Sequence, residues 1–290
     1  MKDTLGINDQ MSKMGILQGR LSSSTNGQLQ CFPQDWAKEF KLAYQHGLAF
    51  IELLLDRDFY PPNPLWHDHG VEQIREVLGR SGVAVQSICV DYCISHPLFS
   101  ESKLIRNTAM DSLKDLIPRA KTLGASYLVL PFFEWAELKT EADHARLVEV
   151  LKPLHADLKR YGVVLAIESS LSAEKLQSLL QQFPKETIGV CYDTGNTTSL
   201  GHDVPGDIRR LGSRIVTVHI KDRPLGGQNV LLGEGDADFP EIFKAFSDIG
   251  YSGAMILETQ RGDDPLETAD KHLAFVRSHL EAAAKEKIQS

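Results

Sequence analysis

The chain has 290 residues, of which 42% are hydrophobic and 24% are charged, and its formal net charge at pH 7 is −8. The fractions are those of an ordinary soluble globular protein. An acidic chain gains nothing from the counterion release that drives nucleic-acid binding, so we expect no nucleic-acid partner. No apolar run approaches the ~20 residues of a membrane-spanning helix, so we expect no membrane partner. The sparse cysteines and the lack of a secretory signal favour a cytoplasmic location.

The four cysteines and the N-terminus carry little functional signal. Cys31, Cys89, Cys93 and Cys191 form no CxxC pair and are too sparse for a disulfide scaffold, which favours reduced thiols. Residues 1–13 are polar and lack the apolar core of a secretory signal. We therefore predict a flexible leader over 1–13 and a single domain over 14–285.

Eight short apolar runs recur along the chain. They are mostly continuous β-branched or aliphatic stretches, which is typical of strands buried on both faces of a parallel sheet. The predicted strands are 14–19, 49–55, 84–90, 126–131, 163–168, 188–193, 215–220 and 254–258.

Amphipathic segments lie between these runs. Four of them end at a glycine that suits the position after a helix, at Gly47, Gly82, Gly124 and Gly162, and two of these segments span 102–124 and 141–162. A strand–helix order repeated eight times without a long linker predicts an α/β protein with a closed (β/α)8 TIM barrel. A doubly wound open sheet would need a glycine-rich turn after its first strand, and this chain has none.

Four polar residues stand at the carboxyl ends of the last four predicted strands. They are Glu168, Asp193, His219 and Glu258, spaced 25, 26 and 39 residues apart. Each by itself has a plain structural explanation, since a strand-end Asp often caps the next helix and a buried His often packs in a core. Together they lie on the face where barrel active sites form.

Two Glu, one Asp and one His predict a catalytic metal site. Three carboxylates and one imidazole favour one divalent ion such as Mn²⁺, Co²⁺, Mg²⁺ or Zn²⁺. A structural zinc site would instead use Cys and His in a closed tetrahedron. A metal that chelates a carbonyl and the neighbouring hydroxyl acidifies the C–H between them and stabilises the cis-enediolate. Glu168 and Glu258 are then the catalytic pair that moves the proton.

Several motifs resemble the xylose isomerase-like barrels, a superfamily of sugar-phosphate isomerases and epimerases. D-x-G-N begins at Asp193, H-x-K-D at His219 and G-E-G-x-x-D-F at Gly233, and GILQGRLS (15–22) and FIELLLD (50–56) are similar to the first two strands. The greatest similarity is to the L-ribulose-5-phosphate (L-xylulose-5-phosphate) 3-epimerase group. It covers most of 14–280 and is strongest over 160–260.

The resemblance implies that Glu168, Asp193, His219 and Glu258 bind one divalent ion and that the two Glu exchange the proton. Relatives that resemble endonuclease IV carry a His where this chain has Asn196. Asn196 therefore argues against a three-zinc nuclease. The implied partner is a small sugar or sugar phosphate, and the implied assembly is a homo-oligomer, a dimer or tetramer.

Further residues are candidates for substrate binding. Those after the third, sixth and seventh strands are His96, Asn196, Lys221 and Arg223. His96 could equally be a loop residue beside a proline turn, Lys221 a surface ion-pair residue, and Arg223 either a surface residue or a fork for a hydroxyl pair or phosphate.

The remaining candidates follow the first and second strands or lie in the glycine-rich loop. Gln18 and Arg20 could contact a phosphate or hydroxyl, and Glu52 could bind hydroxyls or be a buried ion-pair partner. Glu234 belongs to a lid over the barrel mouth or to a simple turn.

The sequence thus predicts a metal-dependent sugar or sugar-phosphate isomerase, foremost a ketose 3-epimerase of carbohydrate metabolism. Two alternatives remain open. A keto-inositol-type dehydratase or lyase would use the same site and lose a β-hydroxyl, and a non-catalytic metal- or sugar-binding barrel would keep the site without turnover.

Overall fold

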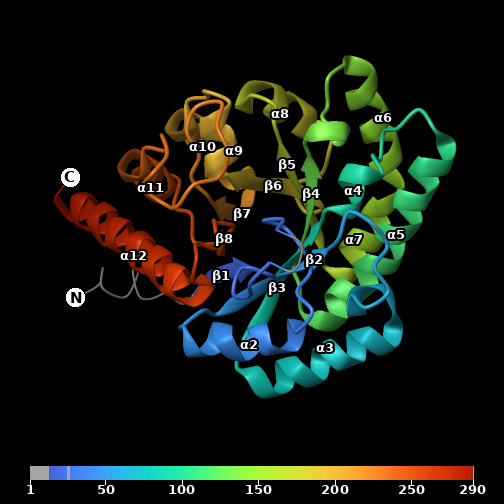
Figure 1. Ribbon diagram of the computed structural model, residues 1–290. Coiled ribbons are helices and arrows are strands. Elements are labelled where there is room, and N and C mark those ends of the chain that lie inside the picture. Colours follow the sequence, from blue (N-terminus) through green and yellow to red (C-terminus); the bar gives the residue numbers. More distant parts are fainter. Residues whose placement is uncertain (1–12, 25–26, 290) are drawn as a thin grey trace.

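The computed structural model describes residues 13–24 and 27–289. Eight parallel strands close into a barrel in which each strand pairs with the next along the chain and β8 pairs with β1. In Figure 1 the strands occupy the middle of the molecule and the helices surround them. The strands are β1 (Met14–Leu17), β2 (Phe50–Leu55), β3 (Ala84–Val90), β4 (Tyr127–Phe132), β5 (Val164–Ser169), β6 (Ile188–Asp193), β7 (Ile215–Ile220) and β8 (Met255–Leu257).

Helices connect the strands on the outside of the barrel. The α-helices are α2 (Trp36–Gln45), α3 (Asp68–Ser81), α4 (Tyr92–Ser95), α5 (Lys103–Leu123), α6 (Glu141–Leu151), α7 (His155–Tyr161), α8 (Ala173–Leu180), α9 (Thr194–Ser199), α10 (Val204–Leu211), α11 (Phe239–Asp248) and α12 (Pro265–Gln289). Short 3₁₀ turns are η1 (Pro64–Trp66), η2 (Glu134–Ala136), η3 (Lys152–Leu154) and η4 (Gly212–Arg214). The predicted TIM barrel is confirmed, and each predicted strand matches an observed one to within a few residues.

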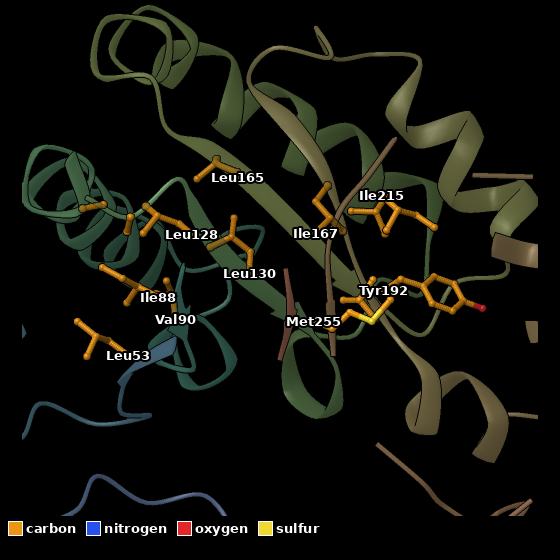
Figure 2. Close-up of a cluster of buried hydrophobic side chains, with 14 of the residues drawn as sticks. Leu53, Ile88, Val90, Leu128, Leu130, Leu165, Ile167, Tyr192, Ile215 and Met255 are labelled. Carbon is orange, nitrogen blue, oxygen red and sulfur yellow. The ribbon is translucent and has the colours of Figure 1, made fainter. Parts of the chain in front are cut away.

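The barrel strands direct one set of apolar side chains outward and another set inward. Figure 2 shows part of the outer layer, where residues such as Leu53, Leu130 and Ile167 pack between the strands and the helices. The inner cluster is Leu17, Leu54, Cys89, Val129, Ala166, Cys191, Ala254 and Ile256. Successive residues of a strand point to opposite faces, so every second residue of each strand faces the barrel axis.

This alternation places the polar strand ends inside the barrel. Ala166 and Cys191 belong to the inner cluster, so the residues two positions later, Glu168 and Asp193, lie on the same inward face. Ile256 precedes Glu258 in the same way. The polar residues therefore form the layer above a cluster of inward apolar side chains.

The helix ends follow the predicted glycines with one difference. Gly82, Gly124 and Gly162 take positive φ directly after α3, α5 and α7. The segment predicted as one helix over 141–162 is instead divided into α6 and α7 by η3. The division falls at Pro153, which has no N–H for an α-helical hydrogen bond.

The predicted leader over 1–13 falls, except for its last residue, outside the described residues. The single-domain assignment over 14–285 stays a prediction. Among the described residues, none of the helices combines the length and the apolar composition needed to span a membrane.

Two glycines of α3 offer a matched test of packing. A Cβ at Gly70 would overlap the backbone of Pro64, with 2.6 Å to its Cα, whereas a Cβ at Gly79 meets nothing within 4 Å. We expect Gly70→Ala to lower the free energy of unfolding by ~1–3 kcal/mol because the η1 turn must move. Gly79→Ala should raise it by ~0.5–1 kcal/mol. Urea denaturation measures both, and equal effects would contradict this account.

Candidate active site

The carboxyl ends of β5, β6, β7 and β8 bring four side chains to one point. Glu168, Asp193, His219 and Glu258 are all buried, and one ligand atom from each lies within 4.8 Å of the others. His219 Nδ1 is 2.7 Å from Glu258 Oε2, 3.7 Å from Glu168 Oε2 and 4.0 Å from Asp193 Oδ2. The structure thus gathers all four residues that the strand-end pattern singled out.

These four donors fit a divalent metal ion. Asp193 Oδ2 and His219 Nδ1 are buried and make no hydrogen bond among the described residues, although both have charged neighbours at ion-pair distance. A buried polar atom without a hydrogen bond is costly, and a bound cation removes that cost. Three carboxylates with one imidazole suit Mn²⁺, Co²⁺, Mg²⁺ or Zn²⁺.

Lys221 supplies a fixed positive charge beside the four residues. Its Nζ lies 2.9 Å from Asp193 Oδ2 and 2.9 Å from Glu258 Oε1, and the residue is buried. Burial alone would lower the pKa of Lys221, but the Asp193 and Glu258 carboxylates outweigh it and raise the pKa above its ordinary value. Lys221 therefore stays protonated and offsets part of the repulsion among the carboxylates.

The two glutamates have opposite electrostatic surroundings. Burial raises the pKa of Glu168 well above its ordinary value, more than the nearby His219 lowers it. Burial acts on Glu258 in the same direction, but Lys221 and His219 reverse the effect and hold the pKa of Glu258 below its usual range. The difference arises because Lys221 is paired with Glu258 and not with Glu168.

A further carboxylate lies behind His219. Glu52 of β2 is wholly buried, and its Oε1 is 2.9 Å from His219 Nε2. Ser87 of β3 donates a hydrogen bond of 2.5 Å to Glu52 Oε2. Contact with Nε2 leaves Nδ1 directed at the other three donors, which is the arrangement that orients metal-binding histidines in proteins.

A cavity of about 1040 Å³ opens above the four residues. Segments after all eight strands contribute to its wall, from Gln28–Phe32 after β1 to Glu258 after β8. Glu168, Glu258, Asn196, Lys221 and Arg223 all line it. Its volume exceeds that of a monosaccharide, and its position at the carboxyl ends of the strands is the usual one for a barrel active site.

Asn196 connects the cavity wall to Glu168. Its side-chain Nδ2 donates to Glu168 Oε1 at 3.0 Å, and its Oδ1 accepts from Arg223 Nη1 at 2.9 Å. Arg223 also donates to the Gly227 carbonyl at 2.7 and 3.0 Å. Asn196 and Arg223 thus hold one oxygen of Glu168 in place.

Five predicted substrate contacts lie outside the cavity lining. Gln18 is buried and accepts from Leu54 N through its side chain, and Arg20 is buried with Nη2 3.8 Å from Glu258 Oε1. Glu52 lies behind His219, as its buried ion-pair alternative anticipated. The direct substrate contacts proposed for these three stay predictions.

His96 and Glu234 are the other two. His96 is half-buried, stacks on Tyr92 with ring centroids 4.0 Å apart and contacts the Tyr92 carbonyl. Glu234 is exposed, and its backbone N–H donates to Leu231 O in a turn. The neighbouring glycines donate backbone N–H groups to the buried Asp222, which gives this loop a structural anchor.

Several cavity residues carried no prediction. Asp91 follows β3, is buried, and accepts from Gln30 Nε2 at 2.7 Å. Burial raises the pKa of Asp91 to about 6. Asp91 directly follows a predicted strand, and a position at a strand end is also what identified the four candidate metal ligands. Outside the cavity lining, Arg261 also carried no prediction. It donates to the carbonyls of Gly19 and Gln28, 242 and 233 residues away in the chain, which local sequence does not indicate.

The family profile described as xylose isomerase-like TIM barrel matches residues 40–279. The chain belongs to this family. The L-ribulose-5-phosphate 3-epimerase UlaE of Escherichia coli O1:K1 is 25% identical over 259 residues, which is 86% of this chain and 91% of the relative. UlaE of Salmonella heidelberg is 24% identical over 258 residues, with the same coverage. The predicted resemblance to this epimerase group is confirmed.

Solved structures agree on the fold. An L-ribulose 3-epimerase superposes with a TM-score of 0.77 at 19% identity, covering 95% of this chain and 97% of the other. The D-psicose 3-epimerase of Clostridium cellulolyticum H10, determined with D-tagatose, gives a TM-score of 0.73 at 18% identity, covering 92% and 99%. The two sequence relatives and the two structures named above are epimerases, and this protein is an isomerase of the same family.

Removing the one nitrogen donor tests the metal site. We expect His219→Ala to lower the affinity for Mn²⁺ more than about a hundredfold, since even residues behind a ligand account for up to that much. The matched control is His46→Ala, which removes a histidine paired with Asp270 at the surface and should leave Mn²⁺ affinity unchanged. Calorimetric titration of the folded variants measures the affinity. Equal affinity in His219→Ala and the wild type would refute His219 as a ligand.

Glu52 should influence the same metal without touching it. Glu52→Gln keeps the shape but removes the charge that faces His219 Nε2, and we expect Mn²⁺ affinity to fall about ten- to hundredfold. Glu267→Gln removes a carboxylate paired with Lys271 on α12 and serves as the control. If Glu52→Gln bound Mn²⁺ as tightly as this control, the orienting role would be wrong.

Proposed function

We propose that the protein is a divalent-metal-dependent ketose 3-epimerase, in which Glu168 and Glu258 transfer a proton to and from the substrate carbon. The single observation that carries the proposal is the gathering of two buried glutamates, one aspartate and one histidine on four successive strands around one point. The names of relatives matched over most of the chain support the choice of reaction.

The two glutamates approach the cavity from different parts of the barrel. Glu168 lies near the end of β5, and Glu258 comes directly after β8. The strands β6 and β7 lie between them in the barrel. Both side chains line the cavity. A substrate carbon held between them can lose a proton to one carboxylate and receive a proton from the other on its opposite face, which inverts the configuration.

Glu168, Asp193, His219 and Glu258 would hold the metal ion. When bound, a divalent cation stabilises the negative charge that develops on the substrate oxygens as the proton leaves carbon. Two further residues of the chain position and balance these ligands. Lys221 balances the charge of Asp193 and Glu258, and Asn196 fixes one oxygen of Glu168.

The proton transfer predicts which variant loses activity. We expect Glu258→Gln to reduce solvent-deuterium incorporation into a ketose by at least ~100-fold, because an amide cannot accept the proton. The measurement is NMR of a panel of ketoses and ketose phosphates in D₂O, with Mn²⁺ and with EDTA. Glu168→Gln should behave alike, and metal content is measured on each variant so that loss of metal and loss of the base are distinguished.

The matched control is Glu241→Gln, which alters a half-exposed glutamate near Arg209 and Lys244 on the outside of the barrel. It should exchange at the wild-type rate. Metal-loaded Glu258→Gln that exchanges near that rate would remove Glu258 from the mechanism. Loss of water from the substrate in place of exchange would replace the epimerase by a dehydratase on the same site.

A further inference from the structure

The cavity wall is acidic well beyond the metal-binding residues. Five additional carboxylates face the cavity from the segments after β2, β3 and β4. They are Asp56, Asp58, Asp91, Glu134 and Glu137. A phosphate ester adds about 1.5 to 2 negative charges at pH 7, so Asp56, Asp58 and Asp91 repel a phosphorylated sugar, while Arg57 and Lys139 partly offset the charges of Glu134 and Glu137.

The cationic side chains of the described cavity lining are Arg57, Lys221 and Arg223, and all three are already engaged. Arg57 donates to both oxygens of Glu134, at 2.6 and 2.9 Å. Lys221 is held between Asp193 and Glu258, and Arg223 is bound to Asn196 and the Gly227 carbonyl. A phosphate that used Arg57 or Lys221 would compete with their carboxylate partners, whereas Arg223 is held by neutral oxygens alone.

The Arg57–Glu134 ion pair depends on an unusual backbone conformation at Glu134. Glu134 has φ of 53°, and it is the only non-glycine residue with positive φ in the described part of the chain. That conformation costs roughly 1–2 kcal/mol for a residue with a Cβ. The fold therefore accepts backbone strain at the position that places a carboxylate on the most exposed arginine of the cavity wall, and such strain is typical of functional sites.

The usual phosphate-binding positions of this fold are also filled. Barrel enzymes often bind phosphate at backbone N–H groups after strands seven and eight. After β7 the N–H groups of Gly233, Gly235 and Ala237 donate to the Asp222 carboxylate at 2.8, 2.9 and 3.2 Å. After β8, Asp264 accepts from Leu266 N and Glu267 N at the start of α12. Protein carboxylates thus already accept from backbone N–H groups in both of these segments.

Neutral hydrogen-bonding groups complete the wall. Gln30, Tyr60, Ser170, Gln228 and Asn229 line the same cavity. Amides, hydroxyls and carboxylates suit the alternating donors and acceptors of sugar hydroxyls, and the acceptor-only carboxylates suit hydroxyls that donate.

From these observations we propose that the substrate is an unphosphorylated ketose, unlike the phosphorylated sugar named for the sequence relatives. The inference rests on the proposed epimerase function. It specifies which class of sugar reaches the two glutamates.

The test compares each free ketose with its terminal phosphate ester. For metal-loaded wild-type protein, kcat/KM for deuterium exchange should be at least ~10-fold higher for the free sugar of the best pair, which corresponds to ~1.4 kcal/mol. Inorganic phosphate at millimolar concentration should not compete with the free sugar. An ester that exchanges as fast as its free sugar, or faster, would overturn the inference and leave the epimerase function intact.

If no pair of free sugar and phosphate ester exchanges deuterium, binding measurements distinguish the substrate proposal from the epimerase proposal. Calorimetry of the metal-loaded protein with the same pairs then decides. Tighter binding of the free sugar supports the cavity inference while the epimerase function fails, and tighter binding of the ester overturns both.

A charge variant tests the cause. Glu134→Gln leaves Arg57 without its carboxylate partner, so the preference should shift toward the ester by about fivefold, the size of one charge interaction at ~4 Å in water. Glu72→Gln removes the partner of Arg75 on the exposed side of α3 and should not change the ratio. An unchanged ratio in Glu134→Gln would show that the wall charge does not set the substrate class.

Discussion

Mutual repulsion among buried carboxylates is the constraint on which the active end of this barrel depends. Glu52, Glu168, Asp193 and Glu258 are buried within one layer, and His219 touches all of them. Removing several like charges from water is expensive unless cations compensate them. Lys221 supplies one such charge, and a divalent ion held by the four donors would supply more. Stability and metal binding are therefore linked, because the same charges determine both.

The barrel resolves this constraint through layers. Small inward residues such as Ala166 and Cys191 fill the axis below, and they leave space for the polar layer above. Residues of β2 and β3 fix this layer, because Ser87 donates a hydrogen bond to Glu52 and Glu52 contacts His219. Two buried arginines, Arg20 and Arg261, bind the carbonyl of Leu29 and so hold the first loop at the cavity rim. Rigid support of this kind is what proton transfer requires, because the reacting groups must be held in place before the substrate arrives.

The charged residues of the cavity wall are the basis of the proposed preference for an unphosphorylated sugar. Glu134 pairs with Arg57 of the wall, and Asp222 binds backbone N–H groups of the glycine-rich loop. A site with the same four inward residues can thus serve different sugars, since the loops after the strands, and not the strands, decide what charge the substrate meets.

Sequence alone determined the barrel and its polar layer, because both follow from local periodicities. Buried strands read as apolar runs, and residues at their ends, Glu168 to Glu258, meet wherever eight such strands close. The break at Pro153 was readable too, although the longer helix was predicted. Tertiary structure decided the partners: Glu52 behind His219, Glu134 on Arg57, and Arg261 on Gly19 across 242 residues. No local pattern encodes these contacts, since they depend on which side chains the closed barrel brings within a few ångströms of each other.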